Sequence, residues 1–264
     1  MRPLLSLLAC GVIAIAPATI GLAAEAGAPA LDDVGTRLQF AFYTADVAAL
    51  RRDLEALAAL EVDDDLLGLR QTYAAYGNWK LAELLKGPDA PAASRAARNC
   101  ALQGEAVAER TPRATLYALL SVCQRLIAEL EGRVRAPLAA GRSRQALERG
   151  MALSPRDPRV LLVAGLNEYE QRQASPAALG NARERFESAI AAFATPYPPG
   201  SATDLYAQAF DWGEAESWVA LGRVRLELGD AVGARDALEH ALVLVEDYRE
   251  ARQLLGQVTG ARPR

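Results

Sequence analysis

Apolar residues recur every three or four positions along most of the chain, and short clusters of glycine, proline and aspartate interrupt the pattern. This spacing is typical of amphipathic α-helices with one buried face, and the interruptions are typical of helix ends. A predicted first hairpin covers residues 31–43 and 46–57, and a second covers residues 65–86 and 92–109. The pattern therefore predicts an all-α chain built from antiparallel helical hairpins.

The unit over residues 215–248 carries the clearest motif. Its first helix contains Trp218, Leu221 and Gly222, Gly229-Asp230 follow, and its second helix contains Ala234, Leu238 and Ala241. This order resembles one tetratricopeptide repeat, a 34-residue helix–turn–helix unit. Small residues at Gly222 and Ala234 predict a close helix crossing, while Gly229 and Asp230 suit a helix end and a helix start. Arg225 stands where the family has an aromatic residue, so we expect different packing there.

Two earlier segments keep the same register. Tyr117, Leu120 and Ser121 occupy the signature positions of one unit, and Leu161, Ala164 and Gly165 occupy those of the next. The resemblance implies a right-handed superhelical solenoid of tetratricopeptide-like repeats, with residues 27–264 forming one domain. Residues 197–214 are predicted to be an insertion with four aromatic residues, Tyr197, Tyr206, Phe210 and Trp212, and residues 247–258 are predicted to be a closing helix.

Three further blocks are similar to a group of exported bacterial tetratricopeptide proteins. They are the sequences AYGNWKL at residues 75–81, SPRDPRV at residues 154–160 and DWGEAE at residues 211–216. The similarity strengthens the prediction of fold and export. It implies no particular activity, because the group has no common one.

Residues 1–26 have the features of a secretory signal peptide. An apolar run extends from Leu4 to Leu22, and Ala24-Glu25-Ala26 matches an A-x-A cleavage site. We expect cleavage, no stable membrane insertion afterwards, and a periplasmic or secreted chain. The alternatives are an uncleaved membrane anchor, which Pro17 weakens, and lipidation at Cys10, where Leu7-Leu8-Ala9-Cys10 resembles a lipobox.

Composition narrows the range of partners. The chain has 29 Lys and Arg against 33 Asp and Glu, a formal net charge of −4, which argues against a nucleic-acid partner. Its apolar share is rich in alanine, which favours closely packed helices. Lys80 and Lys86 are the only lysines, a bias that we attribute to codon composition.

Neither metal binding nor catalysis is expected. Asp63-Asp64-Asp65 open an apolar run, where carboxylates complement a helix N-terminus, and no ligand cluster follows them. His240 is the only histidine, so a His-rich zinc site is not available, and Cys100 and Cys123 lie in other repeats. Without a phosphate-binding or dinucleotide-binding glycine motif, the sequence predicts a non-enzyme that needs no cofactor.

The two internal cysteines lie almost symmetrically about the turn at Thr111-Pro112. Residues equidistant from a short antiparallel turn meet across the hairpin, so Cys100 and Cys123 can form a disulfide if the two helices pack closely. The alternative is a pair of buried thiols that act as small apolar residues.

The resemblance also implies a groove that binds a protein or peptide partner. In this family the groove-facing positions correspond here to Arg159, Leu162, Leu166, Tyr169 and Glu170, and in the next unit to Glu216, Val219, Arg223, Leu226 and Glu227. These side chains can instead pack against the neighbouring repeat or the insertion. The leading hypothesis is an exported adaptor. Its alternatives are a self-associating structural protein, and a carrier of a small molecule or glycan with a pocket under Tyr206, Phe210 and Trp212.

Overall fold

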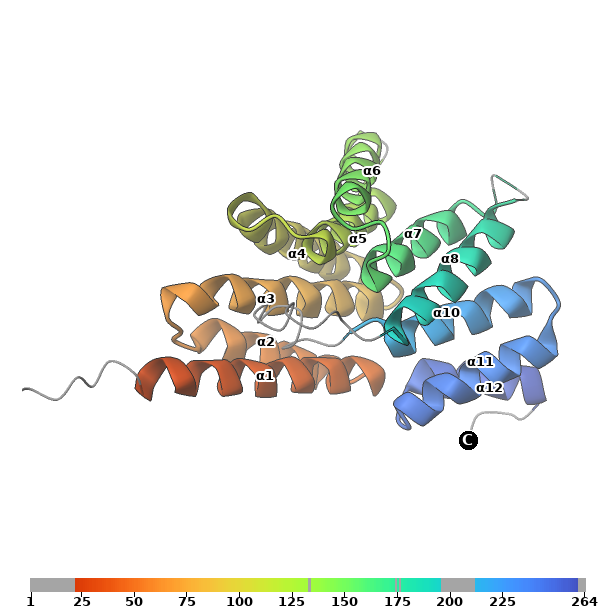
Figure 1. Ribbon diagram of the computed structural model, residues 1–264, viewed down its shortest axis with the longest axis horizontal. Helices are drawn as coiled ribbons and strands as arrows, with labels where there is room; N and C mark the ends of the chain where they lie inside the picture. Colours follow the sequence, from red (N-terminus) through yellow and green to blue (C-terminus); the bar gives the residue numbers. More distant parts are fainter. Residues whose placement is uncertain (1–21, 133, 174, 176, 196–211, 261–264) are drawn as a thin grey trace, which may run out of the picture.

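The computed structural model describes residues 22–132, 134–173, 175, 177–195 and 212–260, and over these residues it contains helices and no strand (Figure 1). The helices are α1 (Leu22–Tyr43), α2 (Val47–Ala59), α3 (Asp64–Leu85), α4 (Ala90–Arg110), α5 (Ala114–Leu130), α6 (Ala136–Leu153), α7 (Pro158–Glu170), α8 (Ala178–Phe193), α10 (Glu214–Glu227), α11 (Ala231–Leu244) and α12 (Arg249–Thr259).

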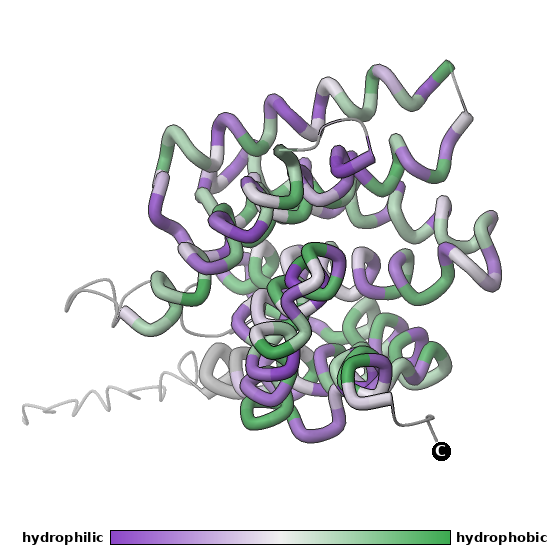
Figure 2. The backbone as a smooth tube through the Cα atoms, turned by 90° about the vertical axis from the view of Figure 1, so that its right-hand side faces the viewer, coloured by the Kyte–Doolittle hydropathy of each residue, from purple (hydrophilic) through white to green (hydrophobic). Residues whose placement is uncertain are grey.

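Consecutive helices pair as antiparallel hairpins: α1 with α2, α3 with α4, α5 with α6, α7 with α8, and α10 with α11. The first helices of neighbouring hairpins also touch, since α3 packs on both α1 and α5, and α7 packs on both α5 and α10. The all-α prediction and the predicted solenoid of helix–turn–helix repeats are confirmed. Hydrophobic and hydrophilic residues alternate at short intervals along much of the chain (Figure 2), as expected of helices that bury part of their surface.

Aspartate side chains begin several of these helices. Asp46 accepts a hydrogen bond from the backbone N–H of Ala49 at 2.9 Å, and Asp230 accepts one from Gly233 at 2.9 Å. These contacts satisfy N–H groups that have no partner inside the helix. The end of α10 also follows the prediction, because Gly229 has a φ of +81°, a conformation that L side chains rarely adopt.

The predicted close crossing of the last hairpin is present. A Cβ on Gly222 would lie 2.8 Å from Cγ of Leu238 and 3.4 Å from the carbonyl oxygen of Ala234. A side chain at position 222 would collide with Leu238, so glycine is what lets α10 and α11 pack this closely. Arg225, the departure from the family pattern, donates to the carbonyl of Gly233 at 3.0 Å and pairs with Glu187 at 3.1 Å. A polar bridge to the neighbouring hairpin thus takes the place of an aromatic contact.

Two details differ from the sequence-based expectations. Helix α1 begins at Leu22 rather than at residue 31, even with Pro29 inside it. Trp212, expected in the insertion, is 1% exposed and belongs to the core that precedes α10. Helix α6 packs mainly on α5 and has few contacts with α7. Helix α4 also packs on α5, and the two helices diverge from each other (Figure 1).

The two ends of the solenoid are in contact. At the end of α1, Phe42 and Tyr43 pack against Tyr248, which precedes α12, with ring centroids 6.0 and 4.7 Å apart. Val219 of α10 and Ala251 of α12 belong to the same apolar cluster. The helical layers therefore curve until the first hairpin meets the last.

No described helix has both the length and the apolar character needed to cross a membrane. Most of the predicted signal, including Cys10, lies outside the described residues, and signal cleavage stays a prediction. Asp63 precedes α3, whose first turn contains Asp64 and Asp65. Among the described residues, no group of three or more His, Cys, Asp or Glu side chains is placed to hold a metal ion.

Candidate functional site

A buried ion pair lies where the first helices of distant hairpins converge. Lys80 of α3 is 1% exposed, and its Nζ lies 3.4 Å from Oε1 of Glu216 on α10 and 3.8 Å from Oε2 of Glu83. The ammonium also lies 3.5 Å from the ring centroid of Trp79 and 4.1 Å from that of Phe42. Aromatic faces attract a cation, so these rings and carboxylates together replace the water that Lys80 has lost.

Hydrogen bonds hold the Glu216 carboxylate in place. It accepts from the backbone N–H of Gly213 at 2.9 Å, from the hydroxyl of Tyr43 at 3.1 Å and from that of Tyr76 at 3.4 Å. Gly213 has a φ of +110°, and a Cβ there would lie 2.9 Å from the ring of Phe193. The carboxylate thus links α1, α3 and the start of α10.

Burial and negative charge act on the tyrosines of this cluster. Burial raises the pKa of Tyr76 and Tyr248 well above the ordinary value, and the nearby carboxylate of Glu216 raises both further. The folded protein therefore favours their neutral form.

We expect alkaline unfolding to follow from these tyrosines. In unfolded chains both phenols lose their protons near pH 10, whereas in the folded state they retain them, so the free energy of unfolding falls as pH rises above about 10. Tyr76 and Tyr248 should therefore ionise only when the protein unfolds. In a pH titration, the rise in tyrosinate absorbance from these two residues should coincide with the loss of the helical circular dichroism signal. The difference between the parent and a Tyr76→Phe, Tyr248→Phe variant isolates that contribution, and a step near pH 10 in fully helical protein would contradict the expectation.

A cavity of 680 Å³ opens beside this cluster. Phe42, Tyr43, Leu84 and Tyr248 provide its aromatic and apolar lining. The charged lining carries both signs in equal number: Lys86, Arg172, Arg223 and Arg249 against Glu83, Glu129, Glu170 and Glu250. The end of α1, the first helices α3, α5, α7 and α10, and the start of α12 all contribute to it. We call this space the concave cavity.

Ion pairs fix much of the cavity rim. Arg125 of α5 lies 3.5 Å from Glu170, 3.7 Å from Glu129 and 3.8 Å from Glu83, and Lys86 pairs with Glu129 at 3.1 Å. Burial alone would raise the pKa of Glu83, but the positive charges of Lys80 and Arg125 outweigh it and hold that pKa below its usual value. Glu83 is therefore ionised, and the rim offers fixed charges to a ligand.

Tyr169 forms the centre of a second group on the rim. The guanidinium of Arg172 lies 4.0 Å from its ring centroid and that of Arg223 lies 5.7 Å from it. Its hydroxyl donates to Glu227, while Arg223 pairs with Glu250. Burial and then the hydrogen bond to Glu227 raise the pKa of Tyr169 to about 12, so the phenol remains a donor at neutral pH.

The structure separates the predicted groove residues into two sets. Arg159, Leu162, Glu216 and Val219 are buried, as the packing alternative allowed, and Leu166 packs against the same core. Tyr169, Glu170 and Arg223 line the concave cavity. Glu227 is adjacent to this set, because it accepts a hydrogen bond from Tyr169 and pairs with Arg172 at 3.2 Å. Leu226, beside it on α10, is half-buried.

Sequence reasoning missed several residues of the site: Phe42, Tyr43, Lys80, Glu83, Tyr248 and Arg249. One usable signal was present, because the only two lysines of the chain are Lys80, in the buried ion pair, and Lys86, on the cavity rim. In a chain that otherwise uses arginine, this restriction indicates positions where a compact ammonium suits the packing.

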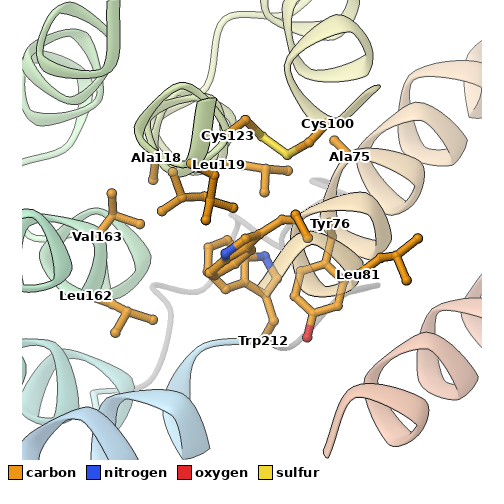
Figure 3. Close-up of a cluster of buried hydrophobic side chains, with 14 of the residues drawn as sticks. Ala75, Tyr76, Leu81, Cys100, Ala118, Leu119, Cys123, Leu162, Val163 and Trp212 are labelled. Carbon is orange, nitrogen blue, oxygen red and sulfur yellow. A yellow bond between two sulfur atoms is a disulfide. The ribbon is translucent and has the colours of Figure 1, made fainter. Parts of the chain in front are cut away.

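Cys100, Cys123 and His240 lie outside the cavity lining. A disulfide joins Cys100 of α4 to Cys123 of α5, with the Cα atoms 5.6 Å apart, and Figure 3 shows it above the buried Trp212. The two helices thus pack closely enough for the predicted bond. His240 is exposed and stacks on Trp218, with ring centroids 4.5 Å apart, so it has a packing contact.

Comparison with solved structures finds a thermophilic tetratricopeptide repeat protein from Thermus thermophilus, with a TM-score of 0.51. The two chains are 16% identical, and the match covers 88% of this chain and 98% of that chain. This likeness shows that the chain has a tetratricopeptide-like fold. No protein-family model matches the sequence, and no curated protein matches it.

Proposed function

We propose that the chain is an exported tetratricopeptide-like scaffold that binds a protein or peptide partner in the concave cavity. The main support for this proposal is the lining of that cavity, where charged side chains of both signs from several helix pairs surround an aromatic base. Repeat solenoids present such extended concave surfaces to partners. The volume, 680 Å³, lies within the range of ligand-binding clefts.

The balance of charges favours a polypeptide over a polyanion. A peptide segment carries amide donors and acceptors and side chains of either sign, which match a rim of arginines and glutamates. Arg249 supports this reading, because it is exposed and no carboxylate of the described residues lies within 4.0 Å of it. The aromatic base of Phe42, Tyr43 and Tyr248 would receive an apolar side chain of the partner.

Export is supported by two features of the chain. The apolar N-terminal run has the composition of a secretory signal, and disulfides such as Cys100–Cys123 persist in oxidising compartments. We therefore place the binding event in the cell envelope or outside the cell.

Self-association is the second candidate function. Leu228 is 44% exposed, Val232 75%, Val243 85% and Leu244 46%, all on the last hairpin. Exposed apolar side chains near the end of a solenoid are positions at which a second copy can pack. The third hypothesis, a carrier pocket, depended on Tyr206 and Phe210, which lie outside the described residues, and on Trp212, whose side chain is in the core.

The function is tested with a partner captured by photo-crosslinking from position 170 in the native cells and then purified. We expect the variant Tyr169→Phe, Arg223→Gln to bind it on the order of tenfold more weakly, because charge-assisted hydrogen bonds contribute about 1.5–3 kcal/mol. Isothermal titration calorimetry measures the difference. Tyr169→Phe removes only the hydroxyl and Arg223 is partly exposed, so the helical circular dichroism should be unchanged.

Arg144 provides the control. It is exposed on α6 and does not line the concave cavity. Arg144→Gln should bind the captured partner as tightly as the parent. Equal affinity of the parent and the Tyr169, Arg223 variant would overturn the proposed cavity function.

A further inference from the structure

A second groove follows α5 and shares no lining residue with the concave cavity. Two adjoining cavities of 490 and 290 Å³ share Glu105, Gln124 and Arg142 and together follow α5 between α4 and α6. The groove exists because both helices pack on α5 while diverging from each other (Figure 1). We call it the outer groove.

The middle of the outer groove is apolar. Leu102 of α4 is 64% exposed and Leu138 of α6 is 62% exposed, and the half-buried Ile127 of α5 lies between these walls. A single exposed apolar residue is common on protein surfaces, but two leucines that face one groove from opposite helices form a patch typical of an interaction site. They offer an apolar strip to a side chain from outside.

The two walls carry opposite charges toward one end. Arg142 and Arg149 share one face of α6, and Arg135, which directly precedes the helix, continues the same seven-residue spacing. Glu105 and Glu109 line the facing side of α4. Among the described residues no carboxylate lies within 4.0 Å of the guanidinium of Arg142 or of Arg149, although Arg149 contacts the ring of Tyr117. Both arginines are exposed and are available to carboxylates of a partner.

We propose that the outer groove is a second docking site, which takes one amphipathic α-helix with an acidic edge from a partner protein. The arginines from residue 135 to residue 149 extend about 21 Å along α6 at the helical rise, which matches roughly four turns of a docked helix. Apolar side chains of that helix would lie between Leu102 and Leu138, and glutamates spaced by about two turns would meet Arg142 and Arg149. A basic residue on its other edge would meet Glu105 and Glu109.

The surroundings favour this occupant. Both walls and the base are helices, so there is no strand edge for an extended peptide to join, and helix-in-groove docking fits this geometry. The glutamates of α4 would repel the phosphates of a nucleic acid. The disulfide between Cys100 and Cys123 holds α4 against α5, which keeps one wall and the base in a fixed relation before binding.

Two synthetic helical peptides test the proposal with the purified full chain. Both carry leucines along one face, and the edge that faces α6 carries glutamates in one peptide and lysines in the other. Fluorescence anisotropy should give a dissociation constant about tenfold lower for the acidic peptide. The variant Arg142→Glu, Arg149→Glu should reverse this preference, and Leu138→Asp should weaken both peptides.

The control is Arg144→Glu on the same helix, since Arg144 is exposed and lines neither cavity of the outer groove. It should leave the preference unchanged, as should Tyr169→Phe, Arg223→Gln in the concave cavity. Equal binding of the two peptides, no binding of the acidic peptide, or an unchanged preference in the double arginine variant would overturn the proposal. A dimer in sedimentation that Leu138→Asp dissociates would also overturn it, because a second copy would then occupy the groove.

Discussion

Replacement of Glu216 by glutamine is expected to lower the free energy of unfolding by about 3 kcal/mol, because it leaves the buried Lys80 without its nearest carboxylate. Lys80 is 1% exposed, so water cannot take the place of the lost charge. Glu83, at 3.8 Å, keeps part of the compensation, which sets the expected loss at the lower end for a broken buried pair. Urea unfolding followed by circular dichroism measures the change.

A double-mutant cycle separates the ion pair from other effects of the substitution. Lys80→Met with Glu216→Gln should cost clearly less than the sum of the two single changes, since neither charge then remains unpaired. The control is Glu239→Gln, which removes an exposed pair with Arg235 at 2.7 Å and should leave the free energy of unfolding almost unchanged. A loss for Glu216→Gln as small as for this control would show that the buried pair does not stabilise the fold.

This ion pair also supports the concave cavity. Lys80 lies on α3 and Glu216 on α10, so their contact joins hairpins that are distant in sequence. Tyr43 adds the end of α1 through its hydrogen bond to Glu216, and it also lines the cavity. The arrangement of the rim therefore depends on the buried cluster beneath it.

Local features of the fold were predictable because their causes lie within a few residues. Gly229 and Asp230 end α10 and begin α11 by backbone conformation and capping, and Gly222 sets the helix crossing by its size. The facing positions of Cys100 and Cys123 followed from their distances to one short turn. Each inference needed only helical geometry.

The candidate site was less predictable because distant segments build it. Helical periodicity identifies a buried face but not its neighbour, so the contact of Phe42 with Tyr248 was not foreseen. The assignment of Arg159 and Glu216 to an open groove assumed a regular repeat surface. In the structure the Lys80 cluster and Trp212 fill that part of the concave face. The side chains of Arg159 and Glu216 are therefore buried. The cavity remains near the ends of the first helices, where Tyr169, Glu170 and Arg223 lie.

The two tryptophans near the start of α10 show the same limit. Trp218 occupies the signature position of the repeat, yet it is only half-buried, and it stacks on the exposed His240. Trp212 lies outside the motif, yet its ring is 5.2 Å from that of Trp79. It is also 5.9 Å from the ring of Tyr76, and Figure 3 shows these two side chains together. The guanidinium of Arg159 lies 5.6 Å from the Trp212 ring. Trp212 therefore joins α3, α7 and α10 in one core.

Replacement of Trp212 by alanine is accordingly expected to cost about 3–5 kcal/mol, the range for a large aromatic residue removed from a close-packed core. Trp218→Ala should cost less, because part of its surface is already exposed to water and its stacking partner lies on the surface. Urea unfolding of both variants gives the comparison. If Trp218→Ala were the more destabilising change, the motif tryptophan would be the main packing residue, and the burial of Trp212 between Tyr76 and Trp79 would be wrong. If the expected order holds, the segment before α10 anchors the last hairpin to the rest of the solenoid.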